Sequence, residues 1–212
     1  AYQLEEDNPL KLRFREGGSQ YDIYAVRSAG IDPATGQEIF INKNGEYTFK
    51  YDADDEVVVG NTQPKLQGTW LNTLRYKGWS LNFVFSYTFG GDTYNKTLWE
   101  KVENIDPRYN VDERAFTDRW KNPGDLSRYL AIRQTTQTYN SERFVERLNE
   151  LWLSSATISY EFQAKFLKRL GFKRLAVGVG VTDLVRFSSV KYERGTSYPY
   201  SRTINLMFRP TF

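Results

Sequence analysis

The sequence predicts an all-β fold of long antiparallel strands that form part of a transmembrane β-barrel. Three observations predict it: apolar and polar residues alternate over long stretches, connections alternate between short and long, and aromatic residues are frequent. The 212 residues include 14 Phe, 15 Tyr and 5 Trp, but one Met, no Cys and no His. Aromatic residues favour strands, and period-two alternation is typical of a strand with two different faces.

The clearest alternation runs from Trp79 to Phe89, with aromatic or aliphatic residues at odd positions and mainly Ser, Asn and Thr at even ones. Stretches of this kind are longer than the usual soluble strand of about 5–6 residues. The other expected strands are Leu66–Tyr76, Leu151–Phe162, Lys173–Leu184, Ser201–Phe212, Tyr21–Ala29 and, most weakly patterned, Leu10–Arg15.

The connections fall into two classes. Lys77-Gly78 is a tight turn, and Gln163 to Gly171 is a compact link with one helical turn closed by Gly171. The stretches at about 30–65, 90–150 and 185–200 are long and polar. Outer-membrane barrels have short periplasmic turns and long extracellular loops. With Lys77-Gly78 in the periplasm, every short link and the C-terminus lie on the periplasmic side.

Two short helices are expected inside the longest connection. Asp112 to Trp120 has an acidic start and a basic end, followed by Pro123-Gly124 as a stop. Ser141 to Asn149 is interpreted as a charged helix on a solvated face, because Glu142 and Glu146, like Arg143 and Arg147, are four residues apart.

Composition argues against catalysis. Without Cys or His, thiolate chemistry and the commonest metal ligand are missing, and we expect no catalytic residue, metal or cofactor. The acidic run Asp52, Asp54, Asp55 and Glu56 is more compatible with a solvated turn than with Ca²⁺, because it lacks EF-hand spacing. Glu142 and Glu146 as a glycosidase pair are disfavoured by the helical interpretation.

Net charge and the lengths of apolar stretches also limit the possible partners. A formal net charge of +3 does not suggest nucleic-acid binding. No apolar stretch approaches the ~18–20 residues of a membrane helix, whereas a barrel strand needs only ~9–11 residues.

Several motifs resemble those of SusC/RagA-like TonB-dependent importers, in shared order and spacing over residues 21–212. They are Gly30-Ile31-Asp32-Pro33-Ala34-Thr35-Gly36, Val59-Gly60-Asn61-Thr62-Gln63-Pro64, Tyr76-Lys77-Gly78 with Phe89-Gly90-Gly91-Asp92-Thr93-Tyr94-Asn95, Arg119-Trp120-Lys121-Asn122-Pro123-Gly124-Asp125, Tyr198-Pro199 with Arg202-Thr203, and the terminal Phe212. Two positions depart from the pattern: Asp183 stands where the family usually has Asn, and Pro210, which cannot donate to a ladder, lies in the closing strand.

The resemblance implies that residues 1–212 are the C-terminal segment of a larger, 22-stranded outer-membrane barrel, with the plug domain and N-terminal strands outside this chain. Such a protein imports oligosaccharides or oligopeptides into the periplasm of a Gram-negative bacterium. It is energised by the TonB complex through the missing N-terminal part. A SusD-like surface lipoprotein and outer-membrane lipid are the implied partners.

Aromatic residues supply the candidate contacts. Substrate or partner contact, or packing of the loop on itself, is expected for Tyr94, Trp99, Trp120, Tyr129 and Tyr139. The resemblance implies that Phe208 and Phe212 form the signal for barrel assembly, although both also fit as outward strand residues. An aromatic girdle at strand ends, or ordinary sheet packing, is expected for Trp70, Tyr76, Trp79 and Trp152.

Two alternatives stay open. One is a self-contained soluble barrel of about eight strands, with apolar rows inward around a hydrophobic ligand. The periodicity alone does not distinguish inward from outward rows. The other is a carbohydrate-active enzyme of the β-sandwich type, which hydrolysis of oligosaccharides would support.

Overall fold

The computed structural model describes residues 16–105, 108, 111–131, 138–163, 167, 171–191 and 202–212. The chain folds into two compact units. The loop unit comprises Ala1–Gln63 and Gly91–Arg147, and the wall unit comprises Pro64–Gly90 and Leu148–Phe212. The expected strand Leu10–Arg15, most of the Gln163–Gly171 link and the Tyr198-Pro199 motif lie outside the described residues.

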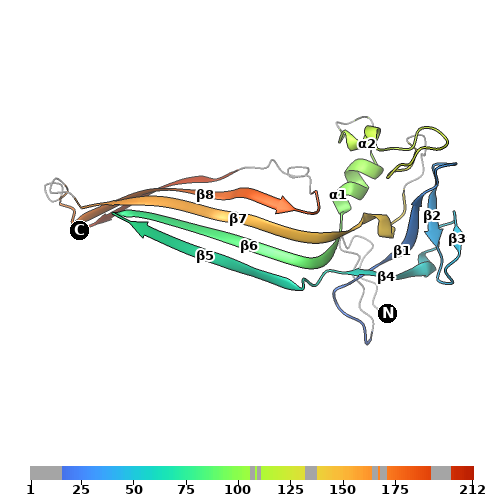
Figure 1. Ribbon diagram of the computed structural model, residues 1–212, viewed down its shortest axis with the longest axis horizontal. Coiled ribbons are helices and arrows are strands. Elements are labelled where there is room, and N and C mark those ends of the chain that lie inside the picture. The colour runs from blue at the N-terminus through green and yellow to red at the C-terminus, as the bar shows by residue number, and fades with distance from the viewer. Residues whose placement is uncertain are drawn as a thin grey trace. The chain divides into compact units, whose positions relative to one another are not determined.

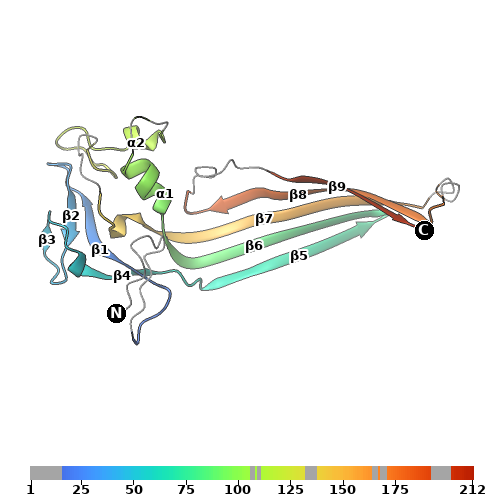
Figure 2. The same cartoon turned by 180° about the vertical axis from the view of Figure 1, so that it is seen from behind.

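The wall unit is built on one long sheet with the strand order β5-β6-β7-β8-β9. Figures 1 and 2 show the five strands side by side from opposite directions. Their bounds are β5 Leu66–Tyr76, β6 Trp79–Tyr94, β7 Val145–Phe162, β8 Arg174–Ser188 and β9 Ile204–Thr211. These strands confirm five of the predicted stretches, and β6, β7 and β8 run further than the alternation indicated. Within the described residues the sheet does not close into a barrel.

The short connections lie at one end of the long sheet. Lys77 and Gly78 have φ values of 45° and 86°, which suit a two-residue turn whose twist matches that of its strands. The Gly78 carbonyl accepts a hydrogen bond from the Glu161 amide at 2.9 Å. Phe162 pairs with Leu175, and Arg174 pairs with Thr211. The predicted alternation of strand direction is therefore confirmed within the sheet.

The long sheet has an apolar face and a polar face. Pairs such as Trp70–Phe85, Ile158–Val179 and Val179–Leu206 place apolar residues opposite one another across the strands. Pairs such as Thr69–Ser86 and Thr157–Gly180 make most of the other face small and polar. The apolar exceptions on this face are Leu71–Val84 and, at one end of β7 and β8, Leu151–Phe187 and Leu153–Val185. Each face continues across all five strands because paired residues point to the same side.

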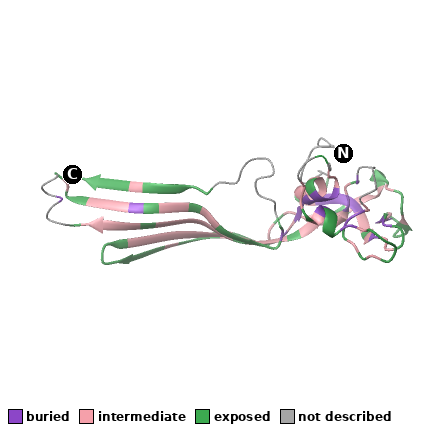
Figure 3. Ribbon diagram, turned by 90° about the horizontal axis from the view of Figure 1, so that it is seen from above, coloured by how far each residue is buried: buried purple, intermediate pink, exposed green. Residues whose placement is uncertain are grey.

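Neither face is covered by other parts of the wall unit. In Figure 3 the long strands are mostly intermediate or exposed, and buried residues gather in the loop unit. Trp70 is 60% exposed, Ile158 46% and Leu206 73%. No sealed interior surrounds these apolar rows in the described residues.

The β7–β8 ladder contains a bulge that alternation does not reveal. Leu153 pairs with Val185, but Ser155 pairs with Thr182, so Asp183 and Leu184 together oppose Ser154. Asp183 has a φ of 54°, a left-handed conformation that Asp and Asn tolerate better than most residues. By contrast, the β8–β9 ladder keeps its register past Pro210, which pairs with Leu175.

Two of the four aromatic residues expected at strand ends lie inside their strands instead. Tyr76 and Trp79 do lie at the ends of their strands, where they pair with each other. Trp70 lies inside β5 opposite Phe85, and Trp152 lies inside the 18-residue β7. Trp152 was expected near the start of its strand because charged residues continue β7 beyond its alternating part.

The loop unit contains a second, smaller sheet with the order β3-β2-β1-β4. Its strands are β1 Asp22–Ile31, β2 Glu38–Ile41, β3 Tyr47–Thr48 and β4 Glu56–Asn61, and a 3-10 helix, Ala53–Asp55, precedes β4. The region at 30–65 is therefore not a plain polar connection, and the strand predicted near Tyr21 belongs to this small sheet. Connections of five to seven residues divide the small sheet into strands that are too short for the period-two signal.

Short helices complete the loop unit. They are α1 Lys96–Leu98, a π-helix at Trp99–Glu103, α2 Arg114–Thr117 and a 3-10 helix at Glu142–Phe144. The α2 helix confirms the prediction at Asp112–Trp120. The helix predicted over Ser141–Asn149 is wrong, because β7 begins at Val145. A core formed by Tyr94, Leu98, Val102, Ala115, Tyr129 and Phe144 holds these helices together.

Candidate functional site

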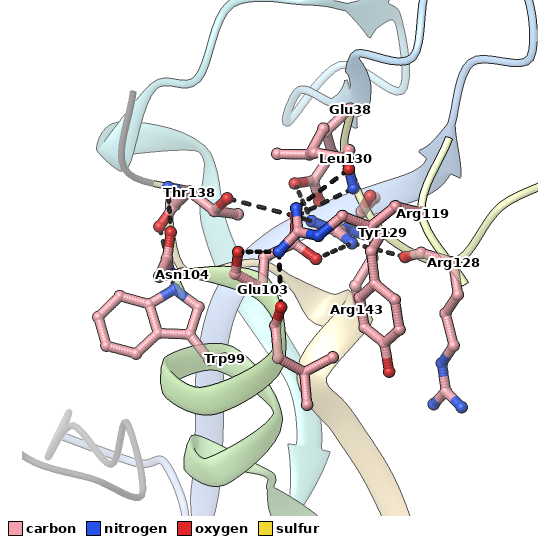
Figure 4. A network of polar contacts seen from close by, with 12 residues as sticks. Glu38, Trp99, Glu103, Asn104, Arg119, Arg128, Tyr129, Leu130, Thr138 and Arg143 are labelled. Carbon is pink, nitrogen blue, oxygen red and sulfur yellow. Dashed lines mark hydrogen bonds and ion pairs between the residues drawn. The ribbon is translucent and has the colours of Figure 1, made fainter. Parts of the chain in front are cut away.

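A buried polar cluster ties the segments of the loop unit together (Figure 4). Its charged members are Glu38 at the start of β2, Glu103 at the end of the π-helix, Arg119 after α2, and Arg143 in the last 3-10 helix. All four side chains are nearly inaccessible to solvent. Two carboxylates and two guanidinium groups balance in charge, which burial requires.

Arg143 is the centre of the cluster. Its Nη2 lies 2.9 Å from a Glu38 carboxylate oxygen and 3.4 Å from one of Glu103. Nη1 also donates to the Arg128 carbonyl at 2.8 Å. Burial disfavours the charged form of Arg143, but hydrogen bonding to Glu38 and the charges of Glu38 and Glu103 outweigh it, so the pKa is raised. Arg143 is therefore a cation held between β2 and the π-helix.

Arg119 acts on the backbone instead of on carboxylates. Its guanidinium group donates to the carbonyl oxygens of Ala115, Val102, Glu103 and Leu130. Burial is the largest influence on Arg119 and lowers its pKa, although the Glu103 charge opposes this. The Arg side chain satisfies carbonyls at the ends of two helices that would otherwise lack donors.

The motif at 119–125 packs against the motif at 30–36. The Trp120 Nε1 donates to the Pro33 carbonyl at 2.8 Å, and the Gly124 amide donates to the same oxygen at 2.8 Å. Gly36 has a φ of 72°, and a Cβ there would lie 2.5 Å from the Trp120 ring. Gly36 is therefore required both by its backbone conformation and by the ring that rests on it.

The Asp32 turn that presents Pro33 is closed by its own side chain. Asp32 accepts hydrogen bonds from the Thr35 hydroxyl at 2.6 Å and from the Ala34 amide at 3.1 Å. The bond from Thr35 is the largest cause that lowers the pKa of Asp32. The carboxylate is thus a structural part of the turn.

A second pair of motifs also meets. The Asn61 amide donates to Asp92 at 3.0 Å, and the Asn61 side chain donates to Asp22 at 2.8 Å. A Cβ on Gly60 would lie 3.1 Å from the Asp92 Cβ and from Val145. Motifs that are far apart in the sequence therefore contact one another within the loop unit: 30–36 contacts 119–125, and 59–64 contacts 89–95.

The five candidate contact residues have different environments. Tyr94 and Tyr129 are buried in the core, which favours the packing alternative for both. The Trp99 Nε1 donates to the Thr138 carbonyl, and Trp120 rests on Gly36. Tyr139 is 55% exposed and stacks on Tyr51, with ring centroids 4.2 Å apart. The structure does not gather the five into one surface.

The other predicted positions lie as follows. Phe208 and Phe212 are exposed, and the Phe212 ring lies 5.1 Å from that of Phe172. Asp52 caps the 3-10 helix by accepting from the Asp54 amide, and Asp55 accepts from the Lys43 amide. Among the residues that the structure describes, no group of His, Cys, Asp or Glu is arranged to hold a metal ion.

Sequence reasoning missed the buried cluster. Arg143 was interpreted as part of a solvated helical face, and it is instead among the least exposed charges of the chain. Glu146, which the same interpretation paired with Glu142, binds Arg128 at 2.6 Å and Asn95 at 2.8 Å. The only available signal was that Phe144 and Val145 interrupt the charged run with apolar residues.

A hollow of about 480 Å³ lies beside the motif at 119–125. Its lining includes Thr117, Asp118, Lys121, Asp125, Leu126 and Arg128. Asp125 already accepts from the Lys121 and Asn122 amides, and Leu126 is 91% exposed at the site.

No described helix is long and apolar enough to cross a bilayer.

Three curated relatives from Formosa agariphila are similar to this chain. TonB-dependent receptor P39 is 25% identical over 172 residues and P3 is 26% identical over 175, covering 79% and 82% of this chain. TonB-dependent receptor P26 is 28% identical over 212 residues, covering 88%. The chain spans only 16% to 21% of the length of these relatives. No family model matches the sequence.

Solved structures of the RagAB peptide importer have a similar fold. The open-open state superposes with a TM-score of 0.71 at 17% identity, over 90% of this chain and 22% of that one. The closed-closed state gives 0.62 at 18% identity, over 81% and 20%. Both comparisons support the predicted resemblance to a segment of SusC/RagA-like TonB-dependent transporters.

Arg143→Met should loosen the loop unit, since it leaves Glu38 and Glu103 buried without their cation. Breaking a buried pair from one side costs about 3–5 kcal/mol. Hydrogen exchange of the full-length protein should show faster exchange in Trp99–Glu103. The matched change Arg147→Met removes a cation that is 52% exposed and 3.4 Å from Asp92, and should cost about 0–1 kcal/mol. Equal exchange in the two variants would contradict the role given to Arg143.

Proposed function

We propose, from the similarity to SusC/RagA-like TonB-dependent transporters, that this chain is the C-terminal part of the barrel of an outer-membrane importer. Residues 1–212 then form one barrel segment, and the plug and N-terminal strands belong to other parts of a longer polypeptide. The importer takes up oligosaccharides or oligopeptides into the periplasm and draws energy from TonB through the plug.

The observation that carries the proposal is the two-faced long sheet. Its apolar face, with Trp70, Ile158 and Leu206 uncovered, suits acyl chains. Its polar face, with rows of Ser, Thr and Gly, suits an aqueous passage. Lipid offers no hydrogen bonds to the backbone, so the open edges of β5 and β9 must be paired by further strands.

The ends of the sheet support an orientation. The tight turn at Lys77-Gly78 and the closing residues of β9 share one end. Short turns are periplasmic in outer-membrane barrels, so the C-terminus is placed in the periplasm. The long connections between strands then belong to the extracellular side, where a SusD-like lipoprotein would lie.

The loop unit supplies a rigid scaffold for contacts with that lipoprotein or with cargo. Its buried Arg119 and Arg143 fix the segments on which the exposed groups lie. Of the five predicted aromatic contacts, Tyr139 is the most exposed, and its stacked ring is already ordered by Tyr51. An ordered aromatic side chain loses little conformational entropy when it binds.

A pair of neighbouring arginine substitutions tests the two faces. Ile158 and Thr157 pair with Val179 and Gly180 and point to opposite faces. Ile158→Arg should lower the amount of folded full-length protein in the outer membrane, because Arg on a lipid face costs about 2–4 kcal/mol. Thr157→Arg should have a much smaller effect.

Membrane fractionation of cells that express the two variants is the measurement. A larger loss with Thr157→Arg, or recovery of the unmodified protein from the soluble fraction without detergent, would contradict the proposal. The second result would support the soluble barrel.

Deletion of Phe212 should reduce insertion of the full-length barrel. Phe212 is 73% exposed at the end of the closing strand, where an assembly factor can bind it. Quantification of folded protein in the outer membrane measures the effect, with Phe212→Tyr as the control that keeps an aromatic ring. Unchanged levels after the deletion would contradict the role of Phe212 as an assembly signal.

A further inference from the structure

The bulge at Asp183 changes which face the outer part of β8 presents. Before the bulge, Val177, Val179 and Val181 point to the apolar face. Val185 and Phe187 continue this odd-numbered series, so alternation alone assigns them to lipid. Because Asp183 and Leu184 together oppose Ser154, the parity reverses and Val185 lies on the same face as Thr182.

Contacts of Arg186 agree with the reversal. Arg186 pairs with Trp152, and its guanidinium carbon lies 5.5 Å from the centre of the indole ring. It also binds Glu150 through two hydrogen bonds of 2.7 and 3.0 Å. Trp152 shares its face with Ile158, which is on the apolar side. Arg186 is therefore on the outer face, and its two neighbours Val185 and Phe187 are on the other.

The level of the bulge fits the outer limit of the bilayer core. Phe162 and Trp152 delimit the uncharged part of the apolar row on β7, and a crossing strand needs ~9–11 residues. The same face carries Arg186 opposite Trp152 and Glu150 beyond it, and the two charges form an ion pair. Trp residues are enriched at membrane–water interfaces, and a Trp beside a charged pair suits that position.

On the polar face, four apolar side chains meet at this level. Leu151 pairs with Phe187, and Leu153 pairs with Val185. Phe187 is 66% exposed, Val185 44% and Leu151 39%. Thr182 and Gly180 lie next to them toward the other end of β8, so the apolar group is confined to the outer end of the passage.

We propose that Asp183 is a positioning residue that turns Val185 and Phe187 away from lipid. With Leu151 and Leu153 they form an apolar rim on the passage side of the wall, at the outer end of β7 and β8. The proposal rests on the proposed barrel function. Val185 and Phe187 then face the passage, although the sequence alternation alone predicts that they face lipid.

Single cysteines in the full-length protein in lipid vesicles test this placement, and the present chain contributes no Cys of its own. Two water-soluble maleimides are compared: a small one, and one linked to a polymer too large to enter the passage. Val185→Cys and Phe187→Cys should react with the small reagent at rates close to that of Thr182→Cys, and only slowly with the large one. Val179→Cys should react slowly with both.

The outcomes separate the two proposals. If Val179→Cys reacts as fast as Thr182→Cys, the membrane barrel itself is contradicted. If Val179→Cys is protected but positions 185 and 187 are equally protected, or react with the large reagent, only the rim is overturned.

A second variant tests Asp183 directly. Asp183→Asn, which accepts the left-handed backbone, should keep the labelling pattern. Asp183→Val, in which a branched side chain opposes that backbone, should slow labelling of Phe187→Cys. Equal labelling in the Asn and Val backgrounds would overturn the positioning role of Asp183.

Discussion

Backbone pairing between long strands is the constraint on which the wall unit depends. Once β7 and β8 are paired, each side chain is committed to one of two faces, and a shift of one residue exchanges them. Across the long sheet this commitment gathers aromatic and aliphatic residues on one side and hydroxyl, amide and glycine residues on the other. The Asp183 bulge is the one place in the β7–β8 ladder where that assignment changes.

The loop unit is held by a different physical device. Its helices have three to five residues each and cannot be stable by themselves. Arg119 ties their terminal carbonyls together, and Arg143 joins the π-helix to β2 through two carboxylates. The motif at 30–36 and the motif at 119–125 meet where Trp120 rests on Gly36. A long connection thereby becomes an ordered body.

The sequence indicated the long strands because their two faces carry different residue types, and the alternation from Trp79 to Phe89, interrupted on the polar face by Val84, carries that signal. It did not reveal the small sheet, since Glu38–Ile41 and Tyr47–Thr48 are too short to show a period. It misassigned Arg143 because charge spacing is local, whereas the partners Glu38 and Glu103 are 105 and 40 residues away. The bulge was hidden for the same reason: only the register against Ser154 defines it. Of the aromatic candidates, burial of Tyr94 and Tyr129 could not be read from composition.

The central claim is that the apolar face of the long sheet contacts the acyl chains of the outer membrane. The most direct test is an electron cryomicroscopy map of the full-length protein in a lipid nanodisc, in which lipid density and side chains are seen together. The account predicts that Phe83, Phe85, Ile158 and Leu206 contact the lipid and that Ser86 and Thr157 line a solvated lumen. A map in which those four side chains fill a sealed interior, while Ser86 and Thr157 meet bulk water, would contradict it.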